Sequence, residues 1–411
     1  MELGKCPAGL LPPQIHGEMP LQGRESRMPA CEVKSADTRG LAGQTVGDTS
    51  VCSVNQTQLI YRGYEIADLA ANATFEEVAF LLLAGHKPSA DELAEFDQAL
   101  KDNRSVESSI LDVIERIAVE PADVHPMSIL RTGISMVSHL DPECEDNSAD
   151  AEYRKSIRLM AKIPTLIGAC QAPRDGRSRV EPDASLSHAA NLLWMLTGKK
   201  PESIATKVMD VSLILYAEHD FNASTFTSRV IASTNSDMHS AVCGGIGALK
   251  GNLHGGANEA AMDMLADIMN DTSDSSMTVE EWMQNAFNEK RKLMGFGHRV
   301  YKNGDHRAGI LREWGLKYCE EVEPDKKVWF DLGDEVQGIM HREKDIHPNV
   351  DFPCGMTYFT LGIPVPQYTP IFVASRITGW CAHIMEQHAN NRIIRPLAQY
   401  AGPDLMSWCD S

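Results

Sequence analysis

Three short stretches of this 411-residue chain gather titratable side chains beside glycines. They read GNLHGGANEA, MGFGHRVYKNGDHRAG and HPNVDFPCG, and they contain His254, His298 and Asp351 respectively. Glycine lets a ligand approach the backbone closely, and imidazole and carboxylate groups can exchange protons near neutral pH. The three stretches are therefore candidates for one site of acid–base chemistry that folding must assemble.

The neighbours of each residue indicate a role. Asp351 stands between two apolar residues, a setting that raises the pKa of a carboxyl group toward that of a working general base. His254 precedes a Gly-Gly pair, which predicts an imidazole held at a helix start. Basic residues that could meet an anion follow His298, namely Arg299, Lys302 and Arg307.

Each residue also has a simpler explanation. A histidine before Gly-Gly is often a hydrogen-bonded turn residue, and an aspartate after Pro-Asn is usually a cap. The basic residues after His298 could be solvated. The occurrence of His, His and Asp together, in this order, favours a functional site.

The elements that must position these residues read as helices. Thr74 and Glu77 form a capping box before an apolar run that ends at Gly85, and Ser89 and Glu92 form a second one. Apolar residues recur at helical spacing in 110–117 and 186–196, and 207–218 is apolar enough for a buried helix. Polar stretches at 141–155, 172–185 and 270–278 predict loops. Because no set of alternating strands accompanies these segments, the predicted fold class is all-α.

Composition restricts the class of protein. A formal net charge of -19 argues against nucleic-acid and anionic-membrane partners, and an anionic substrate would need a local arginine cluster. The ten cysteines contain no C-x-x-C pair, so neither a disulfide framework nor a structural zinc site is predicted. No run is apolar and long enough to cross a bilayer. We expect a reducing compartment, the cytoplasm, or the mitochondrial matrix if the proline-rich residues 1–36 are a transit segment instead of a flexible tail.

The strings HGGANEA, GFGHRVYK, NVDF and IFVASRITGWCAHIMEQ, with RIIRP near the end, resemble the signature blocks of the citrate synthase family, which includes 2-methylcitrate synthase. YRGYEIADLA and SLSHAANLLWMLTG resemble further family segments upstream. The resemblance extends from about Gly40 to Pro403. It implies an acyltransferase that condenses oxaloacetate with a short acyl-CoA, without a cofactor or metal, since the CoA thioester is a substrate.

The resemblance also implies roles for individual residues. Asp351 would remove the α-proton of the acyl-CoA, while His254 would donate a hydrogen bond to the thioester oxygen and His298 would polarise the ketone of oxaloacetate. Arginines suit a dianion because they are planar and always charged. The oxaloacetate pocket implied by the family consists of His219, Asn222, Arg307, Phe372, Arg376 and Arg395, and the CoA contacts would be Arg299 and Lys302.

Two residues in this set have particular alternatives, since Asn222 could cap a turn and Phe372 could belong to the core. Arg376 lies in an apolar sequence, so we expect an anionic partner for it. His306 replaces the proline that is usual in the family, which predicts a looser presentation of Arg307. The tail RPLAQY matches neither of the forms associated with the two activities.

By resemblance, the fold is a large helical domain, 37–255 and 356–411, with a smaller helical domain, 256–355, inserted into it. A homodimer is implied, in which Arg395 reaches the site of the partner subunit. Citrate formation from acetyl-CoA is the preferred activity, with propionyl-CoA and 2-methylcitrate close behind. Two other interpretations are a helical binding protein without catalysis and an α/β-hydrolase, but the hydrolase would need strands and a G-x-S-x-G motif that the chain lacks.

Overall fold

The computed structural model describes residues 39–41, 43–121, 123–274 and 276–407. The predicted tail, 1–36, lies outside these residues. The chain divides into two compact units, Met1–Asp48 and Thr49–Ser411. In the first unit, the regular element that is described is the 3-10 turn η1 (Arg39–Leu41).

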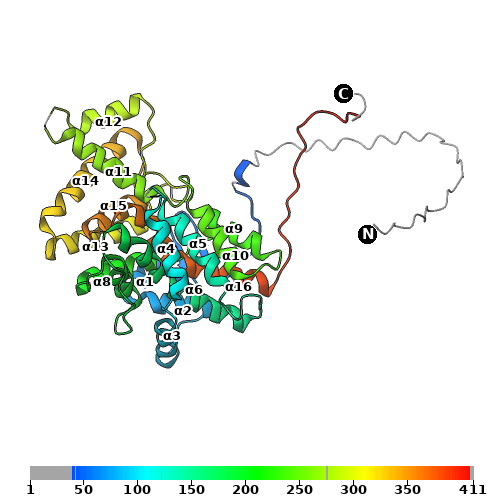
Figure 1. Ribbon diagram of the computed structural model, residues 1–411. Coiled ribbons are helices and arrows are strands. Elements are labelled where there is room, and N and C mark those ends of the chain that lie inside the picture. The colour runs from blue at the N-terminus through cyan, green and yellow to red at the C-terminus, as the bar shows by residue number, and fades with distance from the viewer. Residues whose placement is uncertain (1–38, 42, 122, 275, 408–411) are drawn as a thin grey trace, which may run out of the picture. The chain divides into compact units, whose positions relative to one another are not determined.

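The second unit is helical, as predicted (Figure 1). Its helices are α1 (Ile66–Asn72), α2 (Phe75–Ala84), α3 (Ala90–Asp102), α4 (Ser108–Val119), α5 (Pro126–Ser138), α6 (Ala149–Arg174), α7 (His188–Thr197), α8 (Ser203–Tyr216), α9 (Ala223–Ala232), α10 (Met238–Leu249), α11 (Ala257–Thr272), α12 (Val279–Asn288), α13 (His306–Glu321), α14 (Val328–Lys344), α15 (Asp351–Thr360) and α16 (Tyr368–Ala389), with 3-10 turns η2 (Pro324–Lys327) and η3 (Val365–Gln367). Among the described residues, no helix combines the length and the apolar composition that crossing a bilayer requires.

Local signals in the sequence set the helix ends. Thr74 and Ser89 both form complete capping boxes, with Glu77 and Glu92 as partners, at the starts of α2 and α3. Gly85 ends α2 with a φ of 86°, a left-handed conformation that glycine adopts without steric cost. The two capping-box predictions and the Gly85 stop are thus confirmed.

The second unit also contains a small three-stranded antiparallel sheet of β1 (Cys52–Val54), β2 (Leu59–Tyr61) and β3 (Tyr64–Glu65), whose strands are too short to show alternation and leave the all-α class unchanged. One sequence prediction about an element was wrong. The predicted loop 141–155 is in fact helical from Ala149 onward. The start of α6 was not predicted because the helix buries polar residues there, and these hide its apolar periodicity. Lys155 is one of them: it is fully buried and donates to the backbone oxygens of Cys144 and Asp146.

The described residues of the second unit form two hydrophobic clusters. The larger one surrounds α16, which packs against α2, α6, α8, α9 and α10. The smaller one joins α11, α12 and α14 with Phe352 and Met356 of α15, and these three helices lie together at one end of the body in Figure 1. This separate cluster supports the proposed inserted domain, 256–355, whose boundaries remain a prediction.

Candidate active site

A pairing between two distant segments brings His298 and Asp351 into one region. The backbone of Gly297 donates to His347 O, Asn349 donates to Gly295 O, and Phe296 forms a bridge with Pro348. Beyond this pairing, α15 begins at Asp351 itself. The GFG stretch and the segment that leads into NVDF are therefore hydrogen-bonded neighbours.

Tyr216, the last residue of α8, connects the carboxylate side of the site. Its hydroxyl donates to Asp351 Oδ1 at 2.8 Å, and its backbone oxygen accepts from Arg376 Nε at 2.8 Å. Its ring meets that of Phe372 edge-on, with centroids 4.5 Å apart. Phe372 and Arg376 occupy one face of α16, and the guanidinium carbon lies 4.7 Å from the Phe372 centroid. Sequence reasoning overlooked Tyr216, because nothing distinguishes a tyrosine at the end of a buried helix from a core residue.

Tyr301 connects the histidine side of the site. Its ring stacks on His298 with centroids 4.6 Å apart, its hydroxyl lies 3.1 Å from His219 Nε2, and Arg307 lies above its ring at 5.8 Å. The His219 and His298 rings are 5.2 Å apart. Tyr301 was also missed, although it lies inside one of the three stretches that the sequence singled out.

The backbone fixes the tautomer of His298. Its Nδ1 accepts from the amide groups of Val300 and Tyr301, at 3.1 and 3.2 Å. Burial, reinforced by the charge of Arg307, lowers the pKa of His298 to about 4. The ring is therefore neutral at pH 7 and carries its proton on Nε2, where it can donate to a ligand.

His254 has the opposite tautomer. The amide N–H of Ser224 donates to His254 Nε2 at 3.2 Å, so this nitrogen is an acceptor and the proton is on Nδ1. The Ser224 hydroxyl lies 2.9 Å from the same nitrogen and accepts a hydrogen bond from Trp380 Nε1. Burial, with a smaller effect of Arg376, lowers the pKa of His254 to about 4. The residue directly after His254 has to be a glycine, because a Cβ at Gly255 would lie 2.5 Å from Leu249 O.

Asp351 is the carboxylate of the site with an elevated pKa. Burial raises its pKa to about 6, and the hydrogen bond from Tyr216 offsets part of this effect. The direction agrees with the prediction from its apolar neighbours. At pH 7 most of the population is ionised and can accept a proton.

The two buried arginines differ in their partners. Arg307 forms an ion pair with Asp305, through Nε at 3.0 Å and the NH2 nitrogen at 2.8 Å. Asp305 also caps α13 and accepts from the Val350 amide. It therefore holds Arg307 by two hydrogen bonds, with His306 at the usual proline position, and the looser presentation predicted from His306 stays a prediction.

Arg376 is 2% exposed and has no carboxylate within ion-pair distance among the described residues. Its one hydrogen bond there is the donation from Nε to Tyr216, and burial lowers its pKa. The anionic partner that the sequence predicts for Arg376 is supplied only at a distance, by the buried carboxylate of Glu218, whose charge opposes the effect of burial on the pKa of Arg376. A buried guanidinium without a direct ion pair is typical of a site that receives an anion.

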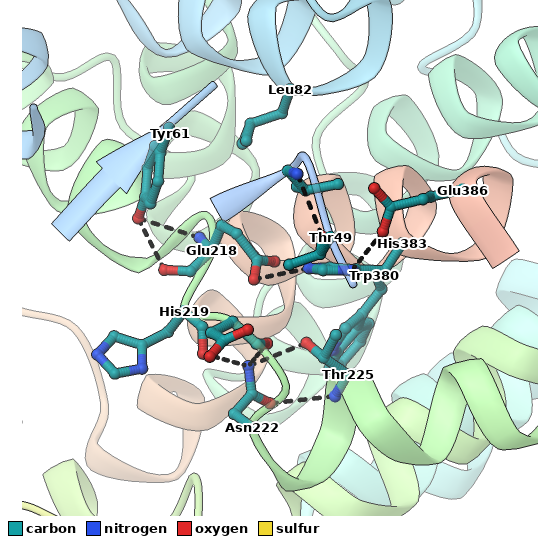
Figure 2. A network of polar contacts seen from close by, with 12 residues as sticks. Thr49, Tyr61, Leu82, Glu218, His219, Asn222, Thr225, Trp380, His383 and Glu386 are labelled. Carbon is teal, nitrogen blue, oxygen red and sulfur yellow. Dashed lines mark hydrogen bonds and ion pairs between the residues drawn. The ribbon is translucent and has the colours of Figure 1, made fainter. Parts of the chain in front are cut away.

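A buried polar network supports the segment that follows α8 (Figure 2). Tyr61 exchanges hydrogen bonds with the backbone of Glu218, whose carboxylate lies 3.0 Å from His383 Nε2. In the same view Asn222 caps α9, where its side chain accepts from the Ser224 and Thr225 amides. Asn222 thus has the capping role that was its simpler alternative.

The remaining predicted residues have exposed side chains. Arg395 is exposed near the end of the described chain. Arg299 and Lys302 are exposed as well, and Lys302 Nζ donates to the backbone oxygen of His298. The described residues thus bring together His219, His254, His298, Arg307, Asp351, Phe372 and Arg376.

Comparison with known proteins gives a consistent result. The family model for the citrate synthase C-terminal domain matches residues 40–397. A 2-methylcitrate synthase from Shewanella oneidensis is 44% identical over 376 residues, covering 90% of this chain and 96% of the relative. A citrate synthase from Mycolicibacterium smegmatis is 42% identical over 366 residues, covering 89% and 95%.

Solved structures agree in fold. A citrate synthase from Pyrobaculum aerophilum superposes with a TM-score of 0.81 at 34% identity, covering 90% of this chain and 93% of that one. The citrate synthase of Thermoplasma acidophilum, solved as a ternary complex with carboxymethyl coenzyme A and oxaloacetate, gives 0.83 at 28% identity, covering 90% and 97%.

Proposed function

The chain belongs to the citrate synthase family, and from this premise we propose that it condenses oxaloacetate with acetyl-CoA and water to give citrate and CoA. The observation that carries the proposal is a partly buried Asp351 with a raised pKa in one contact network with two neutral histidines whose donor nitrogens are fixed. Tyr216 and Phe372 link Asp351 to His254, and the pairing of 295–297 with 347–349 links it to His298. A base and two hydrogen-bond donors are what an enolisation followed by attack on a ketone requires.

The proposed reaction begins with proton transfer from the acyl α-carbon to Asp351. His254 Nδ1–H donates to the thioester oxygen, where the enolate charge develops. His298 Nε2–H donates to the oxaloacetate ketone, which the nucleophilic carbon attacks. Water then cleaves the thioester, releasing CoA and citrate.

We propose Arg376 and Arg307 as the main ligands of oxaloacetate within one chain, with His219 on the ketone side and Phe372 as a wall of the pocket. Arg376 supports this assignment because its guanidinium is buried and forms no ion pair with a described residue. The contacts of CoA with Arg299 and Lys302, the homodimer and the arrival of Arg395 from a second copy remain proposals derived from the family. Closure of the domain 256–355 over the larger one would exclude water.

Propionyl-CoA is the second candidate substrate, favoured by the 44% identical relative named 2-methylcitrate synthase. One methylene changes binding by about 1 to 3 kcal/mol, so a small difference in the pocket decides the preference. The free thiols of the described cysteines are compatible with a reducing compartment, and we propose the cytoplasm.

The decisive experiment measures thiol release from acetyl-CoA and propionyl-CoA with oxaloacetate, using purified full-length protein. We expect turnover with both thioesters and a higher kcat/KM for acetyl-CoA. The opposite ratio would assign 2-methylcitrate synthesis. Absence of turnover with either thioester, in protein that still binds oxaloacetate, would favour the binding protein without catalysis.

A further inference from the structure

A group of potential metal ligands lies away from the residues proposed for catalysis. It consists of Cys144 in the loop before α6, Asp237 at the cap of α10, and His239 in the first turn of that helix. One ligand atom from each lies within 4.8 Å of the other two. His239 Nδ1 is 3.9 Å from both Cys144 Sγ and Asp237 Oδ1.

The orientation of the His239 ring is that of a metal ligand. Its Nε2 lies 3.4 Å from Asp141 Oδ2, which favours the proton on Nε2 and leaves the Nδ1 lone pair facing the thiol and Asp237. The ring is 1% exposed, and its one hydrogen bond with a described residue is the 3.9 Å contact with Cys144 Sγ. A carboxylate behind a ligating histidine is the usual outer-shell arrangement of zinc sites.

The surrounding residues are held in place. Arg158 binds both oxygens of Asp141, at 2.9 and 2.7 Å, and Asp141 O accepts from the Cys144 amide. The buried ammonium of Lys155 donates to the backbone oxygens of Cys144 and Asp146. Helix α5, which precedes the loop, packs against both α6, which follows it, and α10, which carries His239 (Figure 1). The elements that carry the three ligands are therefore fixed relative to one another.

We propose that Cys144 Sγ, Asp237 Oδ1 and His239 Nδ1 bind a zinc ion, with water as the fourth ligand. Tetrahedral zinc with bonds of about 2.0 to 2.3 Å places its ligand atoms roughly 3.3 to 3.8 Å apart. The two distances from His239 Nδ1, both 3.9 Å, therefore need to shorten by only tenths of an ångström, while Cys144 Sγ and the Asp237 oxygen lie within 4.8 Å of each other. Thiolate and imidazole together select zinc over magnesium or calcium. One thiolate and one carboxylate also balance the charge of the ion.

Binding would replace the thiol proton. Zinc forms the bond to sulfur as the proton leaves to solvent, and affinity therefore rises with pH. The ion would fasten the 141–148 loop to the start of α10, whose far end leads to the His254 turn.

The test uses purified full-length protein stripped of metal, with cobalt and zinc as probes. Wild-type protein should bind one cobalt ion with the near-ultraviolet charge-transfer band of a thiolate ligand, and zinc should displace it. Cys144→Ala should lose the band and weaken zinc binding by more than about 100-fold, whereas Asp141→Asn should weaken it by about 10- to 100-fold. Condensation activity of Cys144→Ala serves as the control for folding.

Two matched variants make the result specific. Cys243→Ala removes another partly buried thiol on α10 that is not in the group, and it should keep the band. His341→Gln disrupts a second potential group, His341, Asp345 and His347, which is largely exposed, and it should keep the band too. Absence of the band in wild-type protein, or its persistence in Cys144→Ala, would overturn the proposal.

Discussion

Asp351 owes its raised pKa to burial, and Tyr216 opposes that effect by donating to the charged form. Because only the ionised carboxylate accepts a proton, kcat/KM should fall as pH decreases through about 6. In Tyr216→Phe the charged form loses its hydrogen bond, so the acidic limb of the pH profile should move to higher pH.

Tyr358→Phe is the matched control for this change. Tyr358 is also buried, but its hydroxyl lies 2.6 Å from Ser212 Oγ and has no contact with Asp351. Its acidic limb should stay at the wild-type position. Equal pH profiles for Tyr216→Phe and wild-type protein would contradict the role given to Tyr216.

The two buried arginines should respond differently to the same substitution. Arg307→Met strands Asp305 without its partner and should reduce the free energy of unfolding by about 3 to 5 kcal/mol. Arg376→Met removes a buried charge that forms no ion pair with a described residue, so it should cost far less stability. The KM of the Arg376→Met variant for oxaloacetate should nevertheless rise about 30-fold or more.

Urea unfolding and steady-state kinetics of the two variants measure this contrast. Wild-type protein with and without oxaloacetate provides the reference, since a ligand that binds only the folded state raises the unfolding midpoint. A stability loss in Arg376→Met equal to that in Arg307→Met would show that Arg376 is a structural residue.

At the scale of elements, the close crossing of α16 over the end of α8 depends on Gly379. A Cβ at this position would lie 1.9 Å from Glu218 Oε2 and 2.5 Å from Ala217 O. Gly379→Ala should therefore reduce the free energy of unfolding by about 1 to 3 kcal/mol and displace the segment that carries His219.

Gly338→Ala in α14 is the opposite case. A Cβ there meets no atom within 4 Å, and alanine is the better helix former by about 1 kcal/mol. Chemical denaturation should show a gain in stability for Gly338→Ala and a loss for Gly379→Ala. The same sign for both variants would refute the steric explanation.

His306 offers a gain in stability at the start of α13. His306 is the first residue of α13, and the backbone N–H at that position has no partner within the helix, so a proline would lose no hydrogen bond there. Asp305 before it is extended, with a ψ of 112°, which is the conformation that a following proline favours. His306→Pro should therefore add about 0.4 to 1 kcal/mol to the free energy of unfolding. His306→Ala, which does not fix φ, is the control, and equal midpoints for the two variants would contradict the argument.

Helices were predictable where a cap or a glycine marks their ends, as for α2 and α3 at Thr74, Ser89 and Gly85, although these two helices do not carry the site. Residues whose identity is unusual in an apolar chain, such as Asp351, were found as well. Asp305 was not found although its partner Arg307 is only two residues away, because an aspartate before a helix is usually a cap. Tyr216 was not found, because its function lies in a contact with Asp351, which is 135 positions away in the sequence. The group of Cys144 and His239 was hidden for the same reason.

At the scale of the whole molecule, the proposed homodimer makes a prediction that separates it from a self-sufficient chain. Heterodimers of Arg395→Ala and Asp351→Ala chains should regain activity, because one of their two sites then receives an intact Asp351 and an intact Arg395. Each variant alone should be inactive or nearly so. Purified, tagged heterodimers without activity in the thiol-release assay would rule out a shared site.

The pairing of Arg307 with Asp305 has a consequence for how activity depends on the amount of protein. Asp305 already cancels the charge of Arg307, and the carboxylate of Glu218 acts on Arg376, so the site of one chain has little net positive charge to offer. A dianion held by a single chain would keep excess negative charge in a poorly hydrated pocket. If the proposed dimer supplies Arg395 to this site, diluting the protein until the two chains separate should weaken oxaloacetate binding by mass action.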